Sequence, residues 1–140
     1  VRTLLDPKCR QSRITITEDF PENAIYVYAD AEEVRQVILN LMLNGIEAVE
    51  AQEGTLHISS RRNENGFIKY SILDNGPGIA QNIKQHVFEP LVTTKQHGTG
   101  LGLFVCKRII EKSRGYMGYD VREEGTEFWF KLPEGENRNV

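Results

Sequence analysis

Hydrophobic side chains recur at helical spacing over residues 31–50. Steps of three and four residues predict one long amphipathic helix with a buried stripe. Asp30, three residues before Glu33, forms a capping box that predicts the helix start. The predicted stripe contains Val34, Val37, Ile38, Leu41, Gly45, Ala48 and Val49.

Three further helices are predicted, two of them short. Asp6-Pro7 is typical of a helix start, so residues 7–11 are predicted as one turn or two. Residues 81–86 are a second short helix. The third helix covers residues 101–113 and ends at Gly115 as its C-cap, and its apolar stripe is Leu101, Phe104, Val105 and Ile109.

Six other segments are predicted as strands, and in residues 14–17 and 55–62 apolar and polar residues alternate with the period of a strand that has one buried face. Residues 63–66 and 123–125 have turn composition, which predicts two antiparallel hairpins. His57 lies within one strand and is expected to be an ordinary strand residue. The predicted strands are residues 14–17, 25–28, 55–62, 67–73, 116–121 and 126–132.

Length and composition favour a single domain over residues 1–140, with 39% hydrophobic and 26% charged residues. Residues 1–12 are its start or the tail of a preceding connector, and residues 133–140 are a frayed tail. A net charge of −3 gives no basic field for nucleic acid or membrane. Cys9 and Cys106 are too few for a disulfide framework, which favours reduced thiols in a cytoplasmic protein.

Two carboxamides interrupt the apolar face of the long helix. Asn40 and Asn44 lie one turn apart on one face. A buried amide without a partner costs about 1 to 3 kcal/mol, so both require partners. A neighbouring backbone could supply them, but two amides together favour the wall of a polar pocket, where an amide oxygen can bind Mg²⁺.

Two glycine-containing stretches add candidate binding chemistry. Asp74 ends a predicted strand and is followed by Gly76 and Gly78. A carboxylate can accept a hydrogen bond from the exocyclic amine of adenine, and backbone without side chains lets a flat ring lie against it. Gly98, Gly100 and Gly102 precede a helix, where backbone N–H groups and the helix dipole favour phosphate. Glycine is never followed by lysine, which excludes a Walker A loop.

Together these stretches resemble the ATP-binding catalytic domain of bacterial sensor histidine kinases, a branch of the fold shared with gyrase B, heat-shock chaperones and MutL proteins. Residues 40–44 resemble the N box, 74–78 the first glycine box, 88–95 the F box and 98–103 the second glycine box. The order and spacing of four boxes carry the resemblance. Several subfamilies fit, the sporulation kinases among them.

The resemblance implies an α/β two-layer sandwich, the Bergerat fold: a mixed, mainly antiparallel sheet of about five strands with three helices on one face. It assigns the metal Mg²⁺ to Asn44, the adenine amine to Asp74, and catalysis to Asn40, Asn44 and Lys95. Asn40 stands where related ATPases carry a glutamate base, so slow hydrolysis is implied. The implied ATP contacts are Asn44, Asp74, Gly76, Gly78, Ile79, Thr94, Lys95, Gly98, Thr99, Gly100, Leu101, Gly102, Leu103 and Thr126.

The implied reaction moves the γ-phosphate of Mg-ATP to a histidine on a separate phosphoacceptor and dimerisation domain, which in turn serves a response regulator in a two-component phosphorelay. None of His57, His86 and His97 has the acidic setting of such an acceptor. Dimerisation is expected only through a region N-terminal to this chain, in a cytoplasmic part of a parent kinase that could be membrane-anchored. The alternatives are a serine kinase or ATPase of the same fold, and a non-catalytic nucleotide-responsive docking domain.

Overall fold

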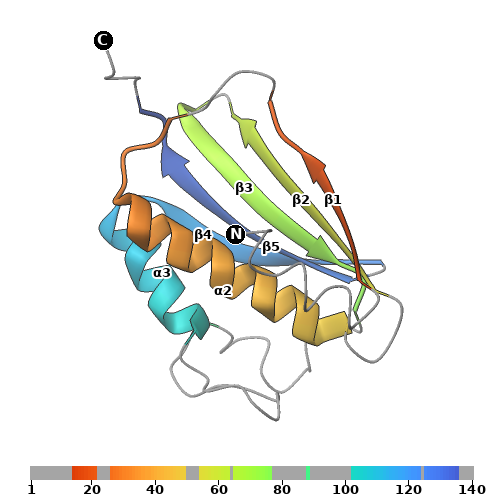
Figure 1. The fold of residues 1–140 in the computed structure, drawn as a ribbon. Helices are drawn as coiled ribbons and strands as arrows, with labels where there is room; N and C mark the ends of the chain where they lie inside the picture. Colours follow the sequence, from red (N-terminus) through yellow and green to blue (C-terminus); the bar gives the residue numbers. More distant parts are fainter. Residues whose placement is uncertain are drawn as a thin grey trace.

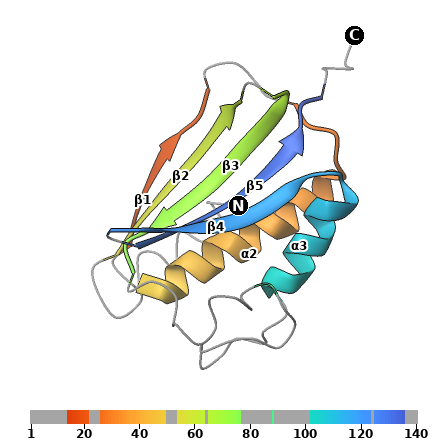
Figure 2. The ribbon, with the colours of Figure 1, turned by 180° about the vertical axis from the view of Figure 1, so that it is seen from behind.

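The computed structural model describes residues 14–21, 26–49, 54–63, 65–76, 88, 102–123 and 125–135. Five strands form one sheet in the order β1-β2-β3-β5-β4, and two helices lie side by side on one of its faces (Figures 1 and 2). The elements are β1 (Thr15–Asp19), α2 (Ala31–Val49), β2 (Thr55–Arg62), β3 (Phe67–Asp74), α3 (Gly102–Lys112), β4 (Tyr116–Arg122) and β5 (Gly125–Pro133).

The sheet is mixed, because β1 runs parallel to β2 while every other neighbouring pair is antiparallel. The predicted mixed, mainly antiparallel sheet of about five strands is therefore confirmed. The expected helices at residues 7–11 and 81–86 lie outside the described residues. The expected count of three helices on one face thus stays a prediction, while α2 and α3 occupy that face.

The core lies between the sheet and the two helices. Thr126, Phe128, Phe130 and Leu132 alternate along β5 as its buried side chains, so every second residue faces α2 and α3. In α2 the buried residues include Met42 and Ile46, which were not predicted, whereas the predicted Val34, Ile38 and Ala48 are only half-buried. The largest fully buried side chains are Leu41, Met42, Ile46, Leu56, Ile110, Leu132, Val37, Val49 and Cys106.

The start of α2 shows the Asp30 half of the predicted capping box, while the Glu33 carboxylate pairs with Lys112 Nζ of α3 at 2.7 Å. Asp30 Oδ1 accepts a hydrogen bond from the backbone N–H of Glu33 at 3.0 Å, which satisfies one of the free donors of the first turn. Further along, Gly45 lets the helix lie close to the sheet. A Cβ at Gly45 would come within 2.8 Å of a methyl carbon of Leu56, so that side chain would have to move.

The end of α3 differs from the prediction in which residue takes the left-handed conformation. Arg114 has φ of 62°. Its N–H donates to Glu111 O at 3.0 Å, and the Gly115 N–H donates to Ile110 O at 2.8 Å, which together make a Schellman motif. Gly115 is needed for packing instead, since a Cβ there would lie 2.2 Å from the carbonyl oxygen of Lys131.

The predicted strand at residues 25–28 is wrong for the part that the structure describes. Val27 makes an isolated bridge with Glu134, and residues 28 and 29 bend away toward α2. The bridge is held by Tyr28 N donating to Pro133 O and by Gly135 N donating to Tyr26 O. Among the described residues, 26–28 pair with residues 133–135 through this isolated bridge rather than through a strand ladder.

The hairpin between β2 and β3 is confirmed. The side chain of Asn63 accepts from the N–H groups of Asn65 and Phe67, at 3.0 and 3.1 Å, and Gly66 has φ of 79°. An Asn side chain that closes the turn and a glycine at positive φ are the chemistry that the sequence signalled.

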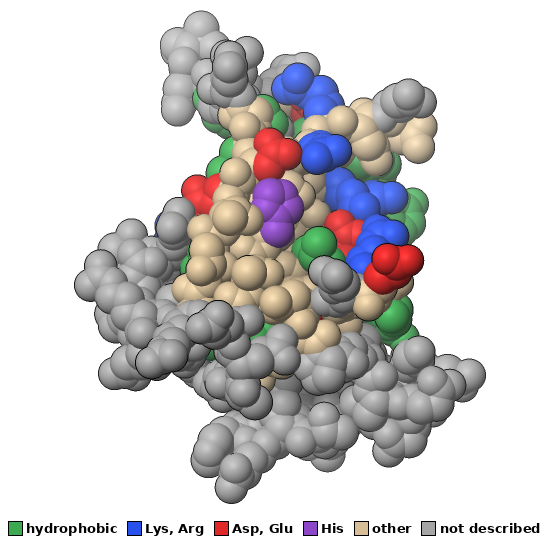
Figure 3. Space-filling view, turned by 90° about the vertical axis from the view of Figure 1, so that its right-hand side faces the viewer, with side chains coloured by type: hydrophobic (Ala, Val, Ile, Leu, Met, Phe, Trp, Pro, Cys, Tyr) green, Lys and Arg blue, Asp and Glu red, His purple; other side chains and the backbone are tan. Residues whose placement is uncertain are grey.

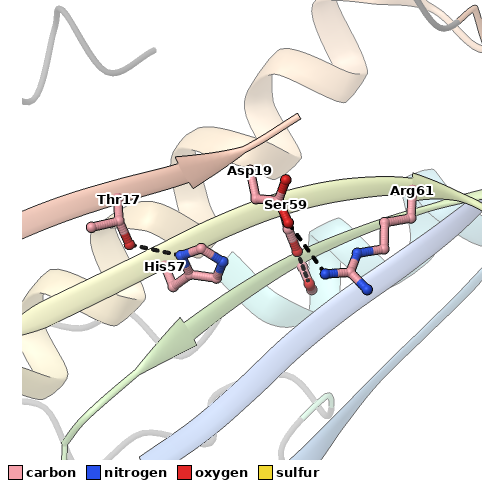
Figure 4. Close-up of polar contacts among 6 residues, drawn as sticks. Thr17, Asp19, His57, Ser59 and Arg61 are labelled. Atoms are coloured by element: carbon pink, nitrogen blue, oxygen red, sulfur yellow. Dashed lines mark hydrogen bonds and ion pairs between the residues drawn. The ribbon is translucent and has the colours of Figure 1, made fainter. Parts of the chain in front are cut away.

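On the face of the sheet opposite the helices, β1 and β2 carry polar side chains. Thr17 Oγ1 lies 2.7 Å from His57 Nδ1 between β1 and β2, and Arg61 pairs with Asp19 at 3.2 Å (Figure 4). Viewed from the β1 side, Figure 3 shows a histidine on the surface, with several basic side chains and some acidic ones nearby. His57 is therefore a strand residue, as predicted, on the side away from α2 and α3.

Among the helices within the described ranges, none combines the length and hydrophobicity needed to cross a membrane.

Gly125 is the backbone position at which the fold tolerates a side chain least. Its φ is 157°, and a Cβ would lie 1.7 Å from the carbonyl oxygen of Asp74. We expect Gly125→Ala to lower the free energy of unfolding by about 2 to 4 kcal/mol, because an alanine is strained at this φ and its Cβ would clash with the backbone of β3. Urea denaturation measures the loss.

Gly66→Ala is the matched control, because Gly66 has a positive φ but nothing within 4 Å of the added carbon. Its expected cost is the conformational term alone, about 1 to 2 kcal/mol. Equal losses in the two variants would contradict the claim that contact between Gly125 and β3 matters.

Candidate functional site

Asp74 is a buried carboxylate at the C-terminal end of β3, with 4% of its surface exposed. Its Oδ1 accepts a hydrogen bond from Gly76 N at 2.9 Å and a longer one from Thr126 N at 3.4 Å. Such donors are required, because a buried charge without partners is strongly unfavourable. The strand end and the start of β5 thus meet around one acidic group.

Thr126, on β5, places a second polar group at this point. The residue is 2% exposed, and its Oγ1 has no hydrogen-bond partner among the described residues. A buried hydroxyl without a partner costs stability, and such groups in native proteins call for an explanation. A bound ligand or ordered water that pairs with this hydroxyl would supply one.

Two glycines bring the backbones together here. A Cβ at Gly76 would lie 2.7 Å from the carbonyl oxygen of Ala48 in α2, and Gly125 lies against the carbonyl of Asp74. Gly76 was predicted as bare backbone for a flat ring; close packing on α2 is a further reason for glycine there. We call Asp74, Gly76, Gly125 and Thr126 the Asp74 corner.

The two predicted amides lie on α2, half-buried and one turn apart. Asn44 is one turn before Ala48, the residue that Gly76 contacts, so it lies on the part of α2 next to the Asp74 corner. Asn40 lies one turn earlier, and its Nδ2 donates to Cys106 Sγ on α3 at 3.5 Å. The amide face of α2 therefore extends from the Asp74 corner to α3.

The first turn of α3 lies beside Asn40. A Cβ at Gly102 would have Asn40 Cγ as its nearest neighbour, at 4.0 Å. Leu103 is half-buried and packs on the core. Of the second glycine box, Gly102 is thus placed next to the amide face of α2, at the end of α3 where the helix dipole is positive.

Phe88 is the one described residue between positions 77 and 101. Its ring packs edge-on against Phe128 at 6.4 Å between centroids and lies 6.2 Å from Tyr119. Lys107 Nζ of α3 lies 5.1 Å from the same ring, within reach of a cation–π interaction. The first residue of the F box is therefore packed between α3 and the β4–β5 hairpin.

Several predicted site residues cannot be placed in this geometry. Those outside the described residues are Gly78, Ile79, Thr94, Lys95, Gly98, Thr99, Gly100 and Leu101.

Sequence reasoning missed two neighbours of the site. Cys106 was not assigned to the buried stripe of α3, although its position four residues after Gly102 places both on one helix face. The observed stripe is Cys106, Ile109 and Ile110, with Phe104 and Val105 only half-buried. Gly125 was read as a turn residue; its contact with Asp74 joins positions far apart in the chain and leaves no local signal.

Comparison with known proteins agrees with this geometry. Residues 29–136 match the family described as histidine kinase-, DNA gyrase B- and HSP90-like ATPases. Sporulation kinase B of Bacillus subtilis (strain 168) is 40% identical over 113 residues, which cover 80% of this chain and 26% of that protein. The chain thus spans about a quarter of that relative's length.

Solved structures give the same assignment. The catalytic domain of histidine kinase ThkA superposes with a TM-score of 0.85 at 34% identity, covering 95% of this chain and 87% of that one. ThkA in complex with the response regulator TrrA matches with a TM-score of 0.81 at 30% identity, over 96% of this chain and 38% of that chain. Full-length ShkA in complex with AMPPNP matches with a TM-score of 0.82 at 29% identity, over 94% of this chain and 28% of that chain.

The family match covers most of the chain, and the Asp74 corner and the amide face of α2 lie within the matched residues. The chain therefore belongs to the histidine kinase-, DNA gyrase B- and HSP90-like ATPase family, as an ATP-binding catalytic domain of the histidine kinase type.

Proposed function

We propose that the Asp74 corner binds the adenine of ATP. The carboxylate of Asp74 accepts from the exocyclic amine, and the hydroxyl of Thr126 supports the ring directly or through water. The observation that carries this proposal is the unpartnered, buried Oγ1 of Thr126 in a residue whose own N–H reaches Asp74. The AMPPNP complex of the similar ShkA supports a nucleotide site on this fold.

We further propose that the triphosphate extends from the Asp74 corner along the amide face of α2 toward α3. Asn44 would hold Mg²⁺, which neutralises phosphate charge, and its amide oxygen is a hard ligand that suits this ion. Asn40 cannot accept a proton as a base, which favours retention of ATP over hydrolysis. Lys95, Thr94, Gly78, Ile79 and residues 98–101 complete the proposed contacts.

The proposed reaction is transfer of the γ-phosphate to a histidine on a separate phosphoacceptor and dimerisation domain. His57, the histidine among the described residues, is held by Thr17 on the sheet face opposite the helices and is remote from α3. Transfer depends on positioning and charge neutralisation, so the acceptor must be brought to the site. A response regulator would receive the phosphate next, as the ThkA–TrrA complex suggests by similarity.

The same proposal places the chain in the cytoplasm as one ATP-binding unit of a longer bacterial kinase. The relatives' greater length supports this, because the chain covers 26% of Sporulation kinase B. A nucleotide-responsive docking domain is the second candidate: Phe88 links the F box to α3 and to the β4–β5 hairpin, so that segment could transmit nucleotide binding without catalysis.

Replacing Asp74 by asparagine tests adenine recognition with little change in shape. Asparagine keeps an oxygen for the Gly76 and Thr126 N–H groups but loses the charged acceptor. We expect ATP affinity to fall by about 1.5 to 3 kcal/mol, roughly ten- to a hundredfold, in calorimetry. Asp120→Asn, on an exposed strand residue, is the control and should bind ATP as the wild type does; unchanged affinity in Asp74→Asn sinks the assignment.

Asn44→Ala tests the metal site. ATP binding by the wild-type chain should tighten when Mg²⁺ is added, roughly tenfold, and the variant should bind equally with Mg²⁺ or with EDTA, because its metal ligand is gone. Asn65→Ala, in the exposed hairpin, should keep the Mg²⁺ response. If Asn44→Ala kept it too, the metal would have to be held elsewhere.

Thr126→Val separates binding from stability. Valine has nearly the shape of threonine and removes the unpartnered hydroxyl, so the free energy of unfolding should be unchanged or higher by up to about 1 kcal/mol. ATP affinity should fall roughly two- to tenfold, by the net value of one hydrogen bond. Urea unfolding and calorimetry measure the two effects, with Thr55→Val as the exposed control. Lower stability with unchanged affinity would mean that the hydroxyl is structural.

A further inference from the structure

The contact between Asn40 and Cys106 joins α2 to α3 at the phosphate end of the proposed site. Asn40 Nδ2 donates to Cys106 Sγ at 3.5 Å, and Cys106 is a free cysteine with no exposed surface. Burial is the largest influence on this thiol and raises its pKa, so it stays neutral at physiological pH. A neutral, inaccessible sulfur is suited to orienting a neighbour.

A carboxamide has two different ends, and its neighbours decide which way each end faces. The NH₂ end donates two hydrogen bonds, whereas the oxygen accepts. Sulfur is a weak acceptor, so the contact with Cys106 turns the NH₂ end of Asn40 toward α3 and the oxygen away from the sulfur. A Cβ added at Gly102 would lie 4.0 Å from Asn40 Cγ, so the side chain of Asn40 lies against the first turn of α3.

We propose that Cys106 is a positioning residue: its sulfur fixes the carboxamide of Asn40 so that the amide oxygen serves the phosphate and metal side of the site. The inference rests on the proposed function, since it gives Asn40 a task at bound Mg-ATP. Cys106 acts only through Asn40. The contact also ties the orientation of that amide to the position of α3, the helix that follows the second glycine box.

The structural alternative is that Cys106 merely fills space between the helices, as buried cysteines often do. The two roles predict different behaviour on substitution. A space-filling residue can be replaced with a loss of stability alone, whereas a positioning residue also changes the state of Asn40 and ligand affinity. Ile110, one turn further along α3 and equally buried, supplies the comparison because it has no described hydrogen bond to Asn40.

The first experiment follows the side-chain amide ¹H–¹⁵N resonances of Asn40 in the 140-residue chain, assigned with Asn40→Ala. Cys106→Ala should shift these resonances without ATP present, and Cys106→Ser, which keeps an acceptor, should shift them less. Ile110→Val should lower the melting temperature, as any loss of core packing does, but should leave the Asn40 resonances unshifted. Equal spectra for Cys106→Ala and the wild type would overturn the proposal.

The second experiment measures the Kd for Mg-ATP by calorimetry. Cys106→Ala should weaken binding roughly three- to tenfold, Cys106→Ser should recover most of the affinity, and Ile110→Val should stay within about twofold of the wild type. When Asn40 is already replaced by alanine, the further change Cys106→Ala should raise the Kd for Mg-ATP by less than about twofold, because the effects of coupled residues are not additive. If Cys106→Ala weakened Mg-ATP binding as much in the Asn40→Ala background as in the wild type, positioning through that amide would be contradicted.

Asp74→Asn distinguishes failure of this inference from failure of the proposed function. If Asp74→Asn loses ATP while the Cys106 variants bind normally, the site stands and the positioning role is wrong. If Asp74→Asn binds ATP like the wild type, the proposed nucleotide site is itself wrong, and the role given to Asn40 and Cys106 falls with it.

Discussion

The carboxylate of Asp74 is buried at the end of β3, and its burial constrains everything around it. It is tolerable because Gly76 N and Thr126 N donate to it, which requires the chain after β3 to turn back and β5 to begin alongside. Gly125 must lack a side chain for β5 to come so close. A buried acidic group beside a hydroxyl that has no partner among the described residues is a costly arrangement for a protein that binds nothing there.

The second part of the site depends on how α2 lies against the sheet and α3. Gly45 and the contact between Gly76 and Ala48 set α2 close to β2 and to the end of β3, so that its amide face begins beside the Asp74 corner. The same face reaches α3 at Cys106. The proposed nucleotide follows this path, with its base at the Asp74 corner and its phosphates toward α3.

Local chemistry made much of the fold predictable. The capping side chain of Asp30 marked the start of α2, and the turn residues from Asn63 to Gly66 marked a hairpin, because each signal lies within a few residues. The failures involve partners distant in sequence. In the described residues 26–28 a single bridge to Glu134 forms instead of a strand ladder, and at the end of α3 Arg114 takes the left-handed conformation while Gly115 packs closely against Lys131. Asp74 and the two asparagines could be named as candidates from the sequence, whereas the contacts of Gly125 with Asp74 and of Cys106 with Asn40 could not.

The most direct test of the central claim is a crystal structure of this chain with Mg²⁺ and AMPPNP. The account predicts the exocyclic amine of adenine within about 2.7 to 3.2 Å of a carboxylate oxygen of Asp74, with the phosphates directed along Asn44 and Asn40 toward α3. A nucleotide bound elsewhere, or a purine that leaves Asp74 paired only with protein groups, would contradict it.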